Sequence, residues 1–101
     1  VLGGGELVVA LSTSGAAPAL AVRLKERLAR LFPEAYGELV AFLRTLRPRI
    51  AQIPSFEERK RLWYRIVDQA LEELDLDPRE GLGRAKEKAE EALKEVAAWT
   101  R

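Results

Sequence analysis

The sequence has no cysteine, histidine, methionine or asparagine among its 101 residues. Without cysteine and histidine, it lacks disulfides, zinc-finger ligand sets, thiol nucleophiles and imidazole bases. Carboxylates alone would have to hold any metal ion. No apolar run approaches the roughly 20 residues of a membrane span, so we expect no membrane association. These absences predict that the chain itself contains no catalytic and no metal-binding residue.

The missing methionine also bears on where the chain comes from. The sequence opens at Val1, inside an apolar and glycine-rich stretch without the basic segment of a signal peptide. We therefore expect a C-terminal fragment of a longer, cytoplasmic protein. A content of 48% hydrophobic and 33% charged residues is typical of a soluble globular domain. The lack of asparagine, together with abundant arginine and glutamate, favours a thermophilic source.

The small net charge of +1 hides an uneven distribution along the chain. Residues 1–66 contain 11 Lys and Arg against 6 Asp and Glu, whereas residues 67–101 contain 6 against 10. A basic front section suits an anionic ligand or a nucleic acid. The simpler interpretation is that helices carry these charges on their solvent-facing sides, because the charges recur at helical spacing.

The pattern of apolar residues predicts a mainly helical protein with one N-terminal strand followed by about four helices. Residues 6–12 form a short, β-branched and apolar run that is typical of a strand covered on both faces. Its hydrogen-bond partners are expected in a second chain or in a missing N-terminal domain. Helices are predicted over 18–31, from Pro33 through a kink at Pro48 to Ile53, from 56 onward, and from 78 to 99.

Local signals support the last two helix starts. Ser55 followed by Glu58 forms a capping box. Asp77 is expected to cap the fourth helix in a similar way, with Pro78 at the first helical position and Glu80 at the third. Four leucines of the first helix are expected on a buried stripe: Leu20, Leu24, Leu28 and Leu31. The third helix is expected to bury one face composed of Phe56, Trp63, Ile66, Val67, Ala70, Leu71 and Leu74.

Three glycine-containing or charged segments stand out in the sequence, and each has a structural explanation. Gly3-Gly4-Gly5 precedes the predicted strand, so a linker explains it better than a dinucleotide-binding loop. Gly81 and Gly83 are expected to be tolerated in the fourth helix at roughly 1 kcal/mol each. Residues 57–65 mix cations with aromatics, as nucleic-acid binders do, but the predicted place of Trp63 on the core stripe favours a structural role.

The turn at Ser12-Thr13-Ser14-Gly15 is the best-placed candidate site. It lies between a strand and a helix N-terminus, where free N–H groups and the helix dipole favour a carboxylate or phosphate. It lacks the Gly-Lys-Ser/Thr ending of a Walker loop. An ordinary capped turn explains the same residues equally well, so both interpretations stay open.

Residues 7–21, read from Leu7 through Ser12-Thr13-Ser14-Gly15 and Pro18 to Ala21, resemble the strand–turn–helix of siroheme synthases. This is the precorrin-2 dehydrogenase and sirohydrochlorin ferrochelatase family. The similarity continues through Leu31-Phe32-Pro33, through Leu46, Arg47, Arg49 and Ile50, and into the segment from Glu58 to Trp63. It covers about residues 7–67 in preserved order.

The resemblance implies a two-part enzyme. Family members oxidise precorrin-2 to sirohydrochlorin with NAD in an N-terminal domain, and many then insert iron. That NAD-binding domain is expected to be absent from this chain. Residues 1–31 would form a dimerisation segment and residues 32–101 a C-terminal helical domain, which close the tetrapyrrole cleft in a homodimer. The substrate-binding residues implied are Ser12, Thr13, Ser14, Gly15 and Arg23.

Arg23 stands with Val22 where many relatives carry paired cations, and this departure removes one substrate-facing charge.

Two alternatives remain beside the enzyme hypothesis. One is a structural dimerisation or regulatory helical module without tetrapyrrole chemistry. The other is a small helical nucleic-acid binder, although we expect no nucleic-acid partner.

Overall fold

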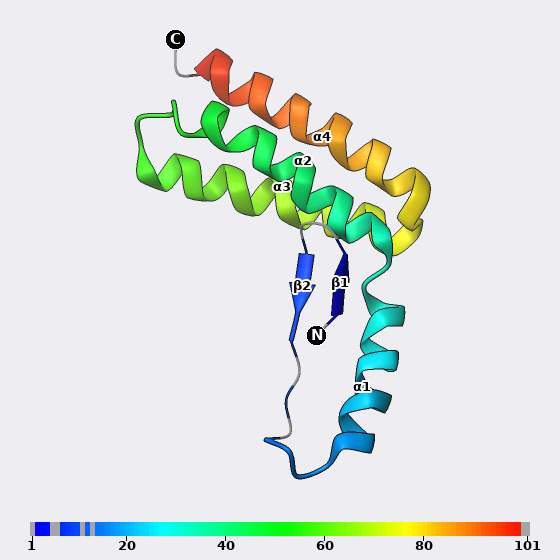
Figure 1. Ribbon diagram of the computed structural model, residues 1–101. Coiled ribbons are helices and arrows are strands. Elements are labelled where there is room, and N and C mark those ends of the chain that lie inside the picture. The colour runs from blue at the N-terminus through cyan, green and yellow to red at the C-terminus, as the bar shows by residue number, and fades with distance from the viewer. Residues whose placement is uncertain (1, 5–6, 11, 13, 100–101) are drawn as a thin grey trace. The chain divides into compact units, whose positions relative to one another are not determined.

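A computed structural model describes residues 2–4, 7–10, 12 and 14–99 of the chain. Its elements are two short strands, β1 (Leu2–Gly4) and β2 (Leu7–Val9), followed by four helices (Figure 1). The helices are α1 (Pro18–Leu31), α2 (Glu34–Ile50), α3 (Phe56–Leu76) and α4 (Pro78–Trp99). The prediction of a mainly helical chain with four helices is confirmed. The chain divides into two compact units, residues 1–41 and 42–101.

The N-terminal unit differs from the prediction in its strands. The predicted continuous strand over residues 6–12 is not supported, because β2 covers Leu7–Val9 and neither Ala10 nor Ser12 belongs to a strand; residues 6 and 11 lie outside the described residues. β2 pairs antiparallel with β1 of the same chain, so that Leu2 lies opposite Val9 and Gly4 opposite Leu7. The prediction that the partner strand must lie outside the chain was therefore wrong for the edge of β2 that pairs with β1. Glycine disfavours strands, which concealed β1 within the supposed linker.

Helix α1 begins at Pro18 and ends at Leu31, as predicted. It contains no buried residue among those described. Leu20 is 53% exposed and Leu31 is 65% exposed, so the predicted buried stripe was wrong at these two positions. The helix is amphipathic, but nothing within its own unit covers these two leucines.

The ends of the other helices follow local chemistry. The Ser55 hydroxyl accepts a hydrogen bond from the Glu58 backbone N–H at 3.3 Å, which confirms Ser55 as the cap of α3. The Asp77 carboxylate accepts from the N–H groups of Arg79 and Glu80 at 2.9 and 3.3 Å, and this caps α4. The kink predicted at Pro48 does not carry the second helix to Ile53, because α2 ends at Ile50 and a turn follows.

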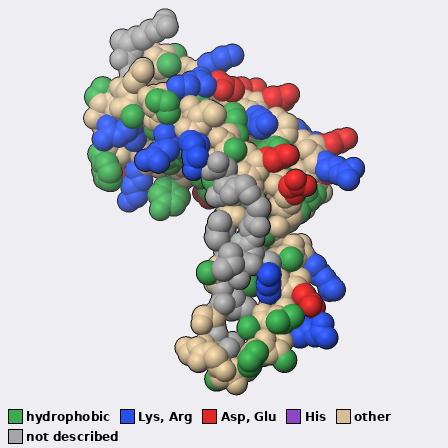
Figure 2. All heavy atoms as spheres, viewed as in Figure 1, with side chains coloured by type: hydrophobic (Ala, Val, Ile, Leu, Met, Phe, Trp, Pro, Cys, Tyr) green, Lys and Arg blue, Asp and Glu red, His purple; other side chains and the backbone are tan. Residues whose placement is uncertain are grey.

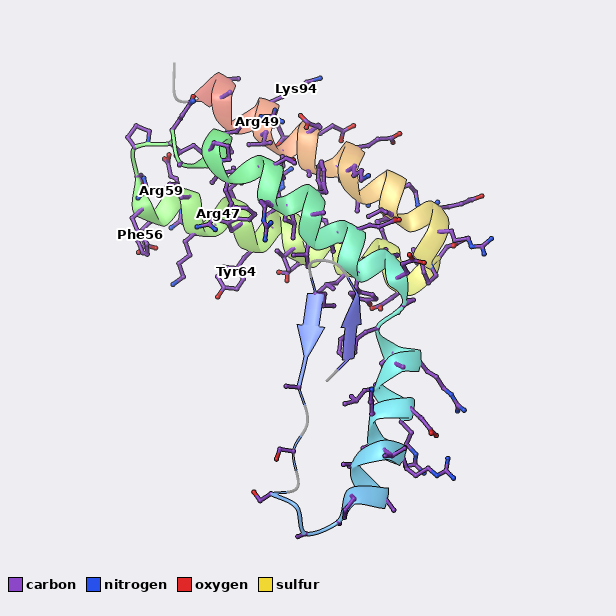
Figure 3. The ribbon with its side chains drawn as sticks, viewed as in Figure 1. Arg47, Arg49, Phe56, Arg59, Tyr64 and Lys94 are labelled. Atoms are coloured by element: carbon purple, nitrogen blue, oxygen red, sulfur yellow. The ribbon has the colours of Figure 1, made fainter. Side chains whose placement is uncertain are left out.

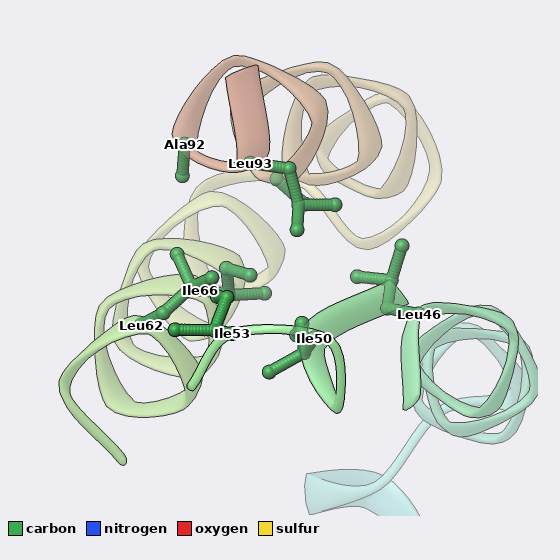
Figure 4. Packing of buried hydrophobic residues seen from close by; sticks show 8 residues of the cluster. Leu46, Ile50, Ile53, Leu62, Ile66, Ala92 and Leu93 are labelled. Atoms are coloured by element: carbon green, nitrogen blue, oxygen red, sulfur yellow. The ribbon is translucent and has the colours of Figure 1, made fainter. Parts of the chain in front are cut away.

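The core of the C-terminal unit lies between α3, α4 and the last turns of α2 (Figure 4). Leu46 and Ile50 of α2, Ile66 of α3 and Ala92 of α4 are at most 1% exposed. Small side chains on α4 let it approach α3 closely. Burying this apolar surface stabilises the unit by roughly 25 cal/mol for each Å² removed from water.

Gly81 packs tightly against the backbone of α3. A Cβ atom placed on Gly81 would lie 2.1 Å from the backbone oxygen of Glu73, whereas one on Gly83 would meet nothing within 4 Å. The sequence-based expectation treated the two glycines alike as tolerated costs. The structure adds a reason for Gly81, since its close contact with the Glu73 backbone leaves no room for a side chain.

Ion pairs join α4 to its neighbours. The Arg49 guanidinium binds both carboxylate oxygens of Glu90 at 2.7 and 2.8 Å, and Arg65 binds Glu95 at 2.7 Å. These pairs are exposed, so each contributes at most about 1 kcal/mol to stability. Through these pairs, Arg49 of α2 and Arg65 of α3 each contact α4.

Glu73 is the one buried charged side chain among the described residues, at 6% exposed. Its carboxylate accepts hydrogen bonds from the Lys88 ammonium at 2.5 Å and from the Arg84 guanidinium at 2.6 Å. The two cations hold the pKa of Glu73 below its ordinary value. A buried carboxylate is tolerated here because both of its oxygens are paired.

Candidate functional site

The predicted substrate turn precedes α1. The Ser12 hydroxyl accepts a hydrogen bond from the Ser14 backbone N–H at 3.1 Å, and both side chains are exposed. Ser14 and Gly15 adopt positive φ angles of 55° and 77°. Thr13 lies outside the described residues. The backbone thus makes a left-handed turn that glycine favours at its second position.

The start of α1 has no side-chain cap. Ala17 is the cap residue and makes no side-chain hydrogen bond to the helix, while Pro18 occupies the first turn. The positive end of the helix dipole favours a negative charge near this helix start. Arg23, the last of the predicted substrate residues, lies farther along α1. Its exposed guanidinium pairs with Glu26 at 3.0 Å, so any ligand must compete with this carboxylate.

A second candidate lies wholly within the C-terminal unit. A groove of about 560 Å³ is lined by the end of α2 and the first half of α3, and we call it the α2–α3 groove. Its apolar lining consists of Ile50 and Ala51 at the end of α2 and Val67 on α3. Three aromatic side chains of α3 complete this lining: Phe56, Trp63 and Tyr64.

Three cations surround the apolar lining of the groove: Arg47 from α2, and Arg59 and Lys60 from α3. Figure 3 shows Arg47 on the side of α2 that faces Arg59 and Tyr64. Arg49 lies on the other side of α2, near α4, the helix that carries Lys94. Of the described residues that line the groove, none is acidic. Figure 2 shows Lys and Arg interleaved with hydrophobic side chains at the end of this unit where α3 begins.

Sequence patterns missed this groove because they assigned its aromatics to the core. Trp63 does pack against the core cluster, as predicted. Phe56, however, is 66% exposed and Leu71 is 39% exposed, so the predicted burial was wrong at both positions. The one available signal was the recurrence of Phe56, Lys60 and Tyr64 every four residues, which places a cation between two aromatics on one face of the helix.

Among the described residues, no group of three or more acidic side chains is placed to bind a metal ion. None of the helices in the described ranges combines the length and the apolarity needed to cross a membrane.

Comparison with known proteins gives two family matches. The family described as "Sirohaem synthase dimerisation region" matches residues 35–97, and "Sirohaem biosynthesis protein central" matches residues 5–31. The chain is 40% identical over 86 residues to a protein named siroheme synthase from Thioalkalivibrio sulfidiphilus, covering 84% of this chain and 17% of that protein. It is 37% identical over 92 residues to another from Methylococcus capsulatus, covering 90% and 18%.

A third siroheme synthase, from Halorhodospira halophila, is 38% identical over 81 residues, which are 79% of this chain and 17% of that protein. The chain therefore spans less than a fifth of the length of these curated relatives. No solved structure matches it.

Proposed function

Because the chain belongs to the siroheme synthase family, we propose that it supplies the dimerisation region and one wall of the tetrapyrrole cleft in a siroheme-forming enzyme. The observation that carries this proposal is the family match over residues 35–97, whose description is a dimerisation region. The division into a segment over 1–31 and a helical domain over 32–101 is part of the same proposal.

The homodimer is supported by apolar surface that the single chain leaves uncovered. On α1, Leu20, Val22 and Leu31 are each more than half exposed. Covering such side chains in a second copy would remove apolar area from water, which is favourable in proportion to that area. The two-stranded hairpin also has an outer edge that a second chain is able to pair with.

The proposed substrate residues are Ser12, Thr13, Ser14, Gly15 and Arg23. All five fall within the second family match, over residues 5–31. Exposed hydroxyls, an uncapped helix start and a guanidinium suit the carboxylates of a tetrapyrrole such as precorrin-2. Arg23 would exchange its bond to Glu26 for one to the substrate.

The parent enzyme is proposed to oxidise precorrin-2 to sirohydrochlorin with NAD, and to use iron as the substrate of a later insertion step. The NAD-binding residues are proposed to lie outside these 101 residues, so that the chain alone catalyses neither step. We also propose that the parent works in the cytoplasm of a thermophilic organism, an inference that the amino-acid composition supports.

The test compares the full-length enzyme with this chain, each given precorrin-2 and NAD, and follows the appearance of NADH. We expect activity from the full-length enzyme and none from the chain. Arg23→Ala in the full-length enzyme should raise KM severalfold, because one charge-assisted contact is lost. Lys25→Ala, which removes a cation two residues along α1, should leave KM unchanged.

Two results would contradict the proposal. If the full-length enzyme forms no NADH from intact precorrin-2, a structural dimerisation module without tetrapyrrole chemistry explains the chain better. If light scattering at high micromolar concentration shows a monomer, the homodimer is wrong.

A further inference from the structure

The α2–α3 groove has cations whose charge is not neutralised by the protein. Among the described residues, neither Arg47 nor Lys60 forms an ion pair, whereas Arg49 and Arg65 each bind a carboxylate of α4. None of the described residues that line the groove is acidic. The lining residues therefore carry a net positive charge, which would attract an anion.

The third cation is held in a defined position. The Arg59 guanidinium donates to the backbone carbonyls of Ile53 and Pro54 and lies 5.9 Å from the centre of the Phe56 ring. These contacts orient both the charge and the ring within the lining of the groove. A ligand would meet this part of the lining without first having to order it, which lowers the entropic cost of binding.

The aromatic side chains of the groove are left open to solvent. Phe56 is 66% exposed and Tyr64 is 61% exposed, while Trp63 is half-buried with one side against the core. Exposed rings on a cationic groove offer flat surfaces on which another ring gains by stacking. The combination of stacking surface and unpaired cations distinguishes the groove from an ordinary solvated helix face.

The size of the groove favours a small molecule over a protein. Its volume of about 560 Å³ falls within the range of roughly 300–1,000 Å³ that is typical of small-molecule sites. A stable protein interface needs roughly 20–30 residues on each side, which the lining of this groove does not approach. The groove also differs from the proposed substrate turn, since it belongs to residues 42–101 and the turn to residues 1–41.

From these observations we propose that the α2–α3 groove binds a small aromatic carboxylate. The ring system of the ligand lies against Trp63 and Tyr64, and its carboxylate is held by Arg47 and Lys60. The proposal does not depend on the siroheme function, because it rests only on the lining of the groove.

The test uses a matched pair of probes, 2-naphthoate and the neutral 2-naphthalenemethanol, added to the full 101-residue chain. Binding is followed by the shift of the Trp63 indole N–H signal in ¹H–¹⁵N NMR spectra. Trp63→Phe identifies this signal. We expect the carboxylate to bind about five- to tenfold more tightly than the alcohol, which is the gain expected from two exposed ion pairs.

A matched pair of variants decides whether the groove cations cause this preference. Arg47→Gln with Lys60→Gln should abolish it. Arg61→Gln with Lys94→Gln removes the same two residue types outside the groove and should leave it intact. Both double variants change exposed side chains, which seldom alters folding stability by more than about 0.5 kcal/mol. Circular dichroism will verify that both keep the helical fold.

Several outcomes would overturn the proposal. Equal affinity for the two probes, or an equal effect of the two double variants, would show that the groove does not recognise the carboxylate. A Trp63 signal that does not move would show that the probes bind elsewhere. If the groove variants instead weaken self-association in sedimentation experiments, a second copy of the chain covers the groove.

Discussion

Gly81 offers the sharpest test of how α3 and α4 pack. Replacing it with alanine adds one methyl group to α4, at a position where that group would lie 2.1 Å from the Glu73 backbone oxygen and 2.6 Å from its carbonyl carbon. Both conflicting atoms belong to backbone, so no rotamer change relieves the contact. The two helices would have to move apart by roughly an ångström to reach an ordinary van der Waals distance.

Two opposing effects set the change in the free energy of unfolding. Alanine favours a helix interior over glycine by about 1 kcal/mol. Overpacking a tight contact costs about 1–3 kcal/mol or more, and the contact here is far shorter than side chains tolerate. We therefore expect Gly81→Ala to lower the free energy of unfolding by about 1–2 kcal/mol after the helix gain is subtracted.

Gly83→Ala is the matched control because it makes the same change two residues away, where nothing lies within 4 Å. It should raise the free energy of unfolding by about 0.5–1 kcal/mol. Urea denaturation followed by circular dichroism compares the two variants, with midpoints interpreted only if the m-values agree. The reasoning is refuted if Gly81→Ala is as stable as the wild type or more stable.

Three further changes test the core, a helix cap and the buried carboxylate. Ile66→Ala should lower the free energy of unfolding in urea by about 2–5 kcal/mol, because Ile66 is 1% exposed, whereas Leu76→Ala at a 78% exposed position should change it by less than about 0.5 kcal/mol. Equal effects would contradict the core assignment. Ser55→Ala should cost about 1 kcal/mol by removing the cap of α3, and a loss of none would show that the cap contributes nothing. The depressed pKa of Glu73 means that its ionised form stabilises the native state above the ordinary glutamate pKa and that this contribution is lost as pH falls through the lowered pKa. The urea midpoint of the wild type should therefore exceed that of Glu73→Gln at about pH 7, and the gap should narrow as the pH falls below the ordinary glutamate pKa; a gap that widens in acid would contradict the assignment.

Helix ends were the most predictable part of the fold because their signals are local. Ser55 and Asp77 cap α3 and α4 through bonds to residues two or three positions ahead, so no distant contact is needed to place these starts. Pro18 likewise marks the first turn of α1. The end of α2 was not predictable in the same way, since Pro48 is compatible with a kink that continues the helix, whereas α2 stops two residues later at Ile50.

The two candidate sites also differ in whether local sequence signals identify them. The turn from Ser12 to Gly15 is a local feature that sequence patterns identify, and its role in binding stays a proposal. The α2–α3 groove was missed because its lining comes from two helices. Arg47 is an ordinary solvated cation when α2 is considered alone, and it becomes part of a groove only where α3 places aromatic side chains beside it.

The sequence by itself determined where the helices of this protein begin and to which family it belongs. Proline, capping side chains and apolar periodicity act over a few residues, and a family pattern is carried by the order of residues along the chain. Only the tertiary structure decided which apolar side chains are covered. Phe56 and Ile66 are both apolar residues of α3, yet one is 66% exposed and the other 1% exposed. The difference arises because burial depends on the surface that another helix presents, and tertiary packing, not local sequence, sets that surface.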